Sequence, residues 1–221
     1  MIMNLDVIKS YIPLYNEALL LTVKIGLLGI LVAFAIGLLG SVVQYFKIPV
    51  LKKLTSVYIE LFRNTPLLVQ LFFIYFALPK IGIKTSAQNC GILGLGLIGG
   101  AYMIETLRSG LESIDKIQSE SALSLGMTKT QVFFHIILPQ AVSISVPGFV
   151  ANVIFLLKET SVFSTISLMD LMFTAKDLIG MYAKTIECLF LLVVYYLIML
   201  LPVSILGTVI ERRVRYAQFG D

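Results

Sequence analysis

Long uncharged apolar runs alternate with short charged segments along most of the chain. An ionised side chain at the centre of a bilayer costs about 2.5–3.5 kcal/mol, so runs without charges mark the segments that can cross a membrane. Four runs reach about 20 residues, which lets a helix cross roughly 30 Å of hydrocarbon. They are residues 25–46, 85–104, 136–157 and 188–210.

A fifth run, residues 64–79, is shorter than the others. It reaches spanning length only if its helix begins near Leu54, which places Glu60 and Arg63 on its first turns. These two side chains are three residues apart, share a helix face and can pair there or extend to the interface. We therefore predict an all-α integral membrane protein with a single domain over residues 1–221. The five predicted spans cover approximately residues 18–46, 54–79, 85–107, 136–158 and 186–210, with a polar loop at approximately 112–135.

Composition agrees with a membrane protein and excludes several kinds of chemistry. Hydrophobic residues make up 58% of the chain and charged residues 14%, with a mean hydropathy of +0.94. Soluble domains carry about 25% charged residues. One His and two Cys are too few for a metal cluster, and Cys90 and Cys188 form no CxxC pair. We predict no metal site, no catalytic residue and no bound cofactor in this chain.

The distribution of Lys and Arg predicts the orientation, because cytoplasmic loops retain positive charges. With five spans, one side collects ten of them: Lys47, Lys52, Lys53, Arg63, Arg108, Lys116, Lys129, Arg212, Arg213 and Arg215. The other side collects six, namely Lys9, Lys80, Lys84, Lys158, Lys176 and Lys184, and Lys24 heads the first span. This asymmetry predicts an outside N-terminus and a cytoplasmic C-terminus. Because the positive charges are those of cytoplasmic loops, with no basic groove studded with aromatic residues, we expect no nucleic-acid partner.

Two glycine patterns bear on nucleotide binding. Residues 94–99 match GxGxxG, but a dinucleotide site needs this pattern in a strand-to-helix turn, and here it falls within a predicted span. We interpret it as a small-residue helix contact, which Gly96 and Gly100 support by their spacing of four. No Gly is followed by Lys, so the chain has no P-loop, and any dependence on ATP must come from a partner.

The polar loop reads as two short helices around a corner. Asp115 and Gln118 have the spacing of a capping box, and the segment after them continues as a helix without a breaker. Gly126 ends this helix where a positive φ is needed. A second helix at 129–136 runs into the fourth span. A helix-turn-helix outside the bilayer has the shape of a docking knob for another protein.

In this loop the sequence resembles the permease subunits of bacterial ABC importers of polar amino acids. That family carries E-A-A, three residues, G, nine residues and I-x-L-P. Here Glu120, Ser121 and Ala122 precede Gly126, and I-x-L-P follows at 136–139 with both spacings kept. Further stretches that resemble the amino acid branch are F-R-N-T-P-L-L-V-Q at 62–70, G-M-T at 126–128, L-P-Q-A at 138–141, L-L-K-E-T-S at 156–161 and E-R-R at 211–213.

The resemblance implies a fold, partners and a location. Such permeases sit in the bacterial cytoplasmic (inner) membrane with five spans and an outside N-terminus. They pair with a second copy or a paralogue, and two cytoplasmic ATPase subunits hold ATP and Mg²⁺. An extracellular or periplasmic solute-binding protein delivers the amino acid. The loop is the family's coupling helix, so by position Glu120, Ser121, Ala122 and Gly126 would contact the ATPase. Transport proceeds by alternating access.

Polar residues within the spans are candidates for the substrate pathway. Asn152 and Glu159, seven apart, share a face of the fourth span. Glu159 could receive the ammonium of a zwitterionic amino acid, while Thr65 and backbone N–H groups near Pro66 could meet its carboxylate. The alternative is that Glu159 pairs with Lys158 or Lys176.

Three more polar residues lie in or next to the predicted spans. Gln70, seven residues after Arg63, either lines the path or makes a contact between helices. Glu105 and Arg108 are interpreted as a structural pair. Related permeases for basic amino acids can carry Glu where this chain has Asn152, so the resemblance favours glutamine, glutamate or aspartate, with cystine less favoured.

Two other functional classes compete with an importer. A gradient-driven secondary transporter of amino acids could use Glu159 or Lys24 for protons, but its usual inverted repeats are not seen. A membrane-embedded enzyme would have to use His135, which lies in the polar loop without a paired carboxylate or nucleophile. We interpret His135 as a polar loop residue.

Overall fold

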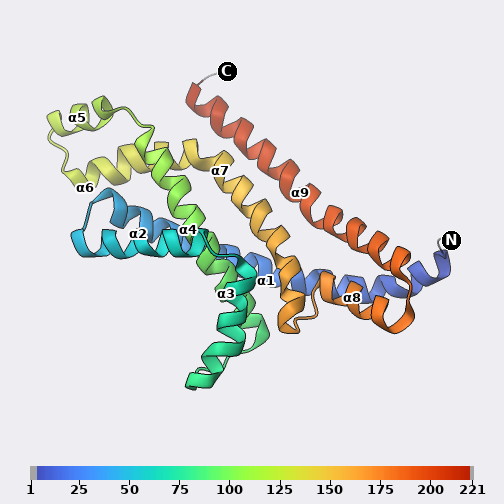
Figure 1. The fold of residues 1–221 in the computed structure, drawn as a ribbon. Helices are drawn as coiled ribbons and strands as arrows, with labels where there is room; N and C mark the ends of the chain where they lie inside the picture. The colour runs from blue at the N-terminus through green and yellow to red at the C-terminus, as the bar shows by residue number, and fades with distance from the viewer. Residues whose placement is uncertain (1–3, 220–221) are drawn as a thin grey trace.

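The structure is a computed structural model that describes residues 4–219, and within them every regular element is a helix or helical turn (Figure 1). The elements are α1 (Leu5–Tyr45), α2 (Pro49–Arg63), α3 (Leu67–Phe72), η1 (Phe73–Ala77), η2 (Leu78–Ile81), α4 (Ala87–Glu112), α5 (Lys116–Ser124), α6 (Lys129–Val132), η3 (Phe133–Ile137), α7 (Leu138–Glu159), η4 (Thr160–Ile166), α8 (Leu171–Tyr182) and α9 (Thr185–Phe219). Of these, η1 and η3 are π-helical turns, and η2 and η4 are 3-10 turns.

Four helical stretches of the described chain are long and apolar enough to cross a membrane. They are Leu5–Tyr45, Ala87–Glu112, Lys129–Ile166 and Thr185–Val214. A bent pair of shorter helices supplies a fifth crossing if both halves belong to one span. The all-helical membrane fold predicted from the apolar runs is therefore confirmed. The first helix begins at Leu5, well before the predicted start at residue 18.

The predicted second span at 54–79 was wrong as one straight helix. Pro49–Arg63 and Leu67–Ile81 meet at 104°. The cause is Pro66, which lacks a backbone N–H and disfavours helical geometry at the residue before it. Asn64 ends α2 and Pro66 precedes α3 in extended geometry. Gln70 and Arg63 consequently do not share a helix face.

The centre of the molecule is the crossing of α1 and α4. Small residues let the two backbones approach: a Cβ added to Gly29 would lie 2.7 Å from Leu95 Cβ, and one added to Gly96 would lie 2.5 Å from Val32 Cγ1. The GxGxxG pattern lies inside α4, so its interpretation as a helix contact is confirmed. Around the crossing lies a buried core to which α3, α7 and η4 contribute.

The two ends of the molecule carry different accessory helices. Figure 1 shows α5 and α6 at the end away from the N-terminus, and α8 beside the start of α1. The loop between the fourth and fifth spans, to which the sequence assigned no helix, forms α8. This helix packs with Tyr15 of α1 and Leu191 of α9 in a second buried cluster. The short helix α8 thereby joins the two long helices α1 and α9 at this end.

Candidate coupling surface and polar cavity

The first helix of the loop, α5, is capped by Asp115, the residue before its first turn. The Asp115 carboxylate accepts a hydrogen bond from the Ile117 backbone N–H at 3.0 Å, which caps the helix. The predicted capping box between Asp115 and Gln118 was wrong, because this cap is made one residue earlier than a capping box requires. A capping box is present before α6 instead, where Thr128 and Gln131 bond each other reciprocally.

Gly126 forms the corner of the loop with a φ of +84°, as the sequence predicted. Its N–H donates to Leu123 O at 3.0 Å, and the Met127 N–H donates to Ala122 O at 3.3 Å. These two bonds define a Schellman motif, which requires a left-handed residue at the position of Gly126. A Cβ added there would meet no atom within 4 Å, so the backbone angle alone selects glycine.

The loop is anchored to the roots of the long helices by a third buried cluster. Ala122 is 6% exposed and Phe133 is fully buried, and both belong to a cluster with Leu107 and Leu111 of α4. The Phe133 ring lies 4.5 Å from the Tyr45 ring at the end of α1. A buried Ala at position 122 lets α5 pack against η3, which carries Phe133. The loop is therefore held against the ends of the long helices by a buried apolar cluster.

The outer surface of α5 carries the other predicted contact residues and an unexpected apolar pair. Glu120 and Ser121 are exposed, and so is Gly126. Ile117 is 61% exposed and Leu125 is 85% exposed. Sequence reasoning missed Ile117 and Leu125 as candidate docking residues. Their signal was two apolar side chains in an otherwise polar segment, one within α5 and one directly after it.

The second helix of the loop leads without interruption into the fourth long helix. α6 passes through the π-helical turn η3 into α7, and residues 129–166 form one candidate span. The loop and Glu159 therefore lie near the two ends of one continuous helical stretch. His135 is exposed within η3, and its Nδ1 lies 3.0 Å from Gln131 O. It lies in the loop as the sequence predicted.

A cavity of about 340 Å³ with polar and apolar lining residues lies where the bend after α2 meets the end of α7. Two of the predicted pathway residues, Thr65 and Glu159, are among its lining residues. Arg63 and Tyr102 line it too and were not predicted for the pathway. A neighbouring hollow of about 390 Å³ shares Arg63 and Tyr102 and extends along α4 to Ser113. The two hollows thus adjoin at Arg63 and Tyr102, one toward the end of α7 and the other toward the end of α4.

Arg63 is held between the two hollows by contacts from α4. Its guanidinium lies 3.2 Å from Glu105 Oε2 and 5.3 Å from the centre of the Tyr102 ring. Arg108 Nε donates to Glu105 Oε1 at 2.9 Å, which confirms the predicted Glu105–Arg108 pair. The possible pairing of Glu60 with Arg63 is replaced, because Glu60 accepts from the Asn64 side chain instead.

Glu159 is the least engaged polar group of the cavity. Among the residues that the structure describes, its half-buried carboxylate has no hydrogen-bond or ion-pair partner, and it does not pair with Lys158 or Lys176. Thr65 is more constrained. Its hydroxyl donates to Leu61 O at 2.8 Å and accepts from the Gln70 side chain at 3.0 Å. Its single hydrogen is therefore already in use.

The remaining two candidates make internal contacts. The Gln70 amide is 8% exposed and donates to Phe62 O and Thr65 O, both at 3.0 Å, so it holds the bend together. Asn152 donates to Thr106 Oγ1 at 2.8 Å and thus joins α7 to α4. Neither residue lines the cavity that contains Glu159. Cys90 and Cys188 are buried free thiols.

Comparisons with known proteins agree with this architecture. A family model described as "Binding-protein-dependent transport system inner membrane component" matches residues 26–216. The probable glutamine ABC transporter permease protein GlnP of Bacillus subtilis (strain 168) is 39% identical over 175 residues, covering 79% of this chain and 80% of the relative. The probable amino-acid permease protein YxeN of the same organism is 36% identical over 206 residues and covers 92% of each chain.

Solved structures show the same fold. A structure titled "Crystal structure of an amino acid ABC transporter with histidines" is 32% identical, with a TM-score of 0.89, and the match covers 96% of this chain and 100% of the other. An inward-facing structure of the MetNI methionine ABC transporter gives a TM-score of 0.76 at 20% identity, covering 93% and 98% of the two chains. This more distant likeness concerns the fold alone.

Proposed function

Because the chain belongs to the family of binding-protein-dependent transport system inner membrane components, we propose that it is the permease subunit of an ATP-driven importer of polar amino acids. It is a transport component rather than an enzyme, and it crosses the inner membrane several times. The observation that carries the proposal is the packed loop that turns at Gly126 and exposes Ile117 and Leu125.

In this proposal, two cytoplasmic ATPase subunits bind Mg²⁺-ATP and receive the loop. Glu120 and Ser121 meet the ATPase with polar groups, while Leu125 enters an apolar cleft. Ala122 and Gly126 act differently, since one anchors α5 and the other fixes the corner. A second permease, either a copy or a paralogue, faces this one across the pathway. A solute-binding protein delivers the amino acid at the opposite face.

Five of the curated relatives support glutamine as the first substrate to test, because their names specify glutamine. Another relative is named for L-cystine, so glutamate, aspartate and cystine belong in the same panel. The cavity volume of about 340 Å³ lies within the ~300–1,000 Å³ range of small-molecule pockets. The cavity therefore has enough volume for a single amino acid such as glutamine.

The cavity offers one group of each sign to a zwitterion. Glu159 is free to bind the ammonium, because no described residue pairs with it. Arg63 is the better partner for the carboxylate than Thr65, since the Thr65 hydrogen is bonded to Leu61 O. Arg63 keeps further N–H donors beyond the one directed at Glu105. Asn152 and Gln70 act by positioning α7 and the bend.

The mechanism follows from the continuity of the loop with α7. ATP binding draws the two ATPases together, and each moves the loop that it holds. Since α6, η3 and α7 are continuous, the motion reaches Glu159 and changes which face of the membrane the cavity opens to. Hydrolysis and release return the pair to the resting state. This is alternating access driven by separate ATPase subunits.

Reconstitution tests the proposal. The chain is placed in liposomes with its genetically neighbouring ATPase and solute-binding protein, and uptake of labelled glutamine is measured. Uptake that needs Mg²⁺-ATP and continues after an ionophore collapses the ion gradients is the expected result. Uptake that an ion gradient drives without ATP would instead identify a secondary transporter.

Glu159→Gln tests the cavity in the same assay. Loss of the carboxylate should raise the KM for glutamine about tenfold, the equivalent of one charge-assisted hydrogen bond. The control is Glu17→Gln, which removes an exposed carboxylate of α1 outside the cavity. An unchanged KM for Glu159→Gln would remove this residue from the pathway.

A further inference from the structure

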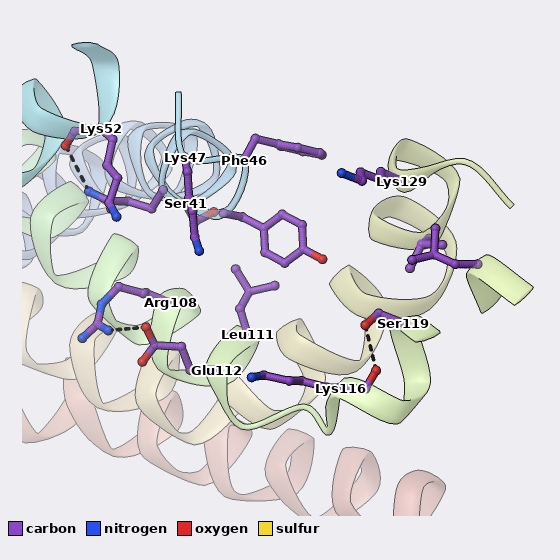
Figure 2. A pocket seen from close by; sticks show the side chains of 14 residues that line it. Ser41, Phe46, Lys47, Lys52, Arg108, Leu111, Glu112, Lys116, Ser119 and Lys129 are labelled. Carbon is purple, nitrogen blue, oxygen red and sulfur yellow. Dashed lines mark hydrogen bonds and ion pairs between the residues drawn. The ribbon is translucent and has the colours of Figure 1, made fainter. Parts of the chain in front are cut away.

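A larger hollow of about 830 Å³ lies beside the loop and has no role in the mechanism above (Figure 2). It forms where the end of α1 and the turn into α2 face the end of α4 and the inner side of α5. Figure 2 shows Lys47 and Lys52 on one wall, Lys116 on the opposite wall and Lys129 at the rim near Phe46.

The charges of this hollow are unbalanced. Arg108 lies in it but is neutralised by Glu105 at 2.9 Å and by Glu112 at 2.6 Å. Among the residues whose side chains the structure describes, the four lysines have no carboxylate within 4.0 Å. Cations gathered in one concave site raise the positive potential there and favour an anion.

The backbone at Lys47 is held in an unfavourable geometry. Its φ is +52°, in the left-handed region that residues with a Cβ rarely adopt. The conformation turns the chain sharply between α1 and α2, and Figure 2 shows the side chain entering the hollow. A non-glycine residue in this geometry is often found where a site depends on it. Here it adds a cation to the wall formed by the end of α1.

The hollow opens beside an apolar surface. Leu39 is 69% exposed and Val50 is 71% exposed, on either side of the turn that carries Lys47. Leu51, next to Lys52, is 46% exposed. Lysines next to exposed aliphatic side chains at the end of a spanning helix match the boundary between lipid headgroups and acyl chains.

We propose that this hollow binds the phosphodiester headgroup of an anionic phospholipid from the inner leaflet. The inference rests on the proposed function for its placement at the cytoplasmic face. The lysines contact the phosphate, while the acyl chains lie against Leu39 and Val50. Since α4 and α5 both border the site, the bound lipid steadies the loop against the span ends.

Most of the residues proposed to face the ATPase lie on another side of α5 than the hollow, and Glu120, four residues after Lys116, lies between the two surfaces. Lys116, Ser119 and Leu123 line the hollow and follow each other at helical spacing on one stripe. Ile117 and Ser121 are one and two positions off this stripe, which turns them about 100–200° around the helix axis. The lipid and the ATPase can therefore bind together.

The chain contains no Trp, which allows a direct test. Phe46→Trp places a single fluorophore at the rim of the hollow, and the full chain is reconstituted in vesicles containing brominated lipids. Brominated phosphatidylglycerol should quench the Trp at a mole fraction about tenfold below that needed with brominated phosphatidylcholine. The triple variant Lys47→Gln, Lys52→Gln, Lys116→Gln should abolish this preference. The matched control is Lys80→Gln, Lys84→Gln, Lys184→Gln, three exposed lysines that do not line the hollow, and it should retain it.

Three results would overturn the proposal. Equal quenching by both lipids would show ordinary annular contact. Relief of quenching by millimolar inorganic phosphate would assign the hollow to a soluble anion. If the Trp variant does not fold, native mass spectrometry of the unsubstituted chain counts retained phosphatidylglycerol, and retention unaffected by the triple variant would contradict the site. None of these readouts needs the ATPase, so a failure of the importer proposal is seen separately in uptake.

Discussion

The helices α5 and α8 lie at opposite ends of the molecule and are built alike. Each starts at an Asp whose carboxylate accepts a backbone N–H: Asp115 from Ile117 at 3.0 Å and Asp170 from Phe173 at 2.9 Å. Each is followed by a residue with positive φ, Gly126 at +84° and Ala183 at +54°. Local rules of capping and termination thus produce two similar short helices.

Their surroundings differ. Asp170 is fully buried, and the Leu171 N–H beside it also donates to Thr22 of α1. Asp115 is exposed. The apolar residues of α8 that include Leu178 pack into a core, whereas Leu125 after α5 is 85% exposed. The helix α8 therefore ties two long helices together, whereas Leu125 at the end of α5 stays exposed.

The largest contrast should come from truncating one leucine at each end. Leu178→Ala opens a cavity in the buried cluster and should lower the free energy of unfolding by about 2–4 kcal/mol. Leu125→Ala should change it by less than about 0.5 kcal/mol, because the side chain is in solvent. Thermal unfolding in detergent measures both. Comparable losses would mean that Leu125 is packed in the isolated chain.

The second contrast concerns the buried cap. Burial raises the pKa of Asp170 to about 7, and one of its carboxylate oxygens has no hydrogen-bond partner among the described residues. The folded state therefore holds a proton that the unfolded chain releases near pH 4, so stability falls as pH rises toward 7. Between about pH 5 and about pH 8 the loss should reach about 2–3 kcal/mol.

Asp170→Asn keeps an oxygen for the Phe173 N–H but removes the charge. The variant should unfold at a higher temperature than wild type at about pH 8, and the difference should shrink toward about pH 5. Thermal melts at the two pH values provide the measurement. A stabilisation that is the same at both would show that the Asp170 proton does not couple to folding.

The smallest contrast concerns the helix ends. Ala183→Gly relieves a left-handed alanine and should stabilise the chain by up to about 1 kcal/mol. Gly126→Ala imposes that strain and should destabilise it by about 1 kcal/mol, although the added Cβ has open space. Chemical unfolding should give changes in the free energy of unfolding of opposite sign for the two variants. Changes of the same sign would show that the positive φ does not determine stability at these positions.

Much of the loop and the spans could be predicted from the sequence, because their signals are local. Charge-free runs located four of the spans, and the spacing after Glu120 located Gly126 and its positive φ. The bend at Pro66 could not be located in the same way. Apolar residues continue on both sides of it, and the Gln70 bonds that hold it depend on the bend itself.

The cavity and α8 were harder to predict because they depend on distant contacts. The Arg63 side chain is held in the cavity by contacts with Glu105 and Tyr102, which lie about 40 positions away along the chain. The helix α8 was missed because it is too short to span and is stabilised by burial against α1 and α9. Glu159 could be named from its place in a span, but its lack of a partner could be seen only in three dimensions.

Co-purification tests the central claim that the corner at Gly126 presents the loop to an ATPase. The chain is expressed with its neighbouring ATPase, extracted in mild detergent and compared with Gly126→Val and Gly180→Val. Both glycines leave open space for a side chain, but only Gly126 has positive φ, so Gly180→Val is the matched control. We expect wild type and Gly180→Val to retain the ATPase, and Gly126→Val to lose it while remaining folded. Equal ATPase recovery with all three proteins would contradict this role of Gly126.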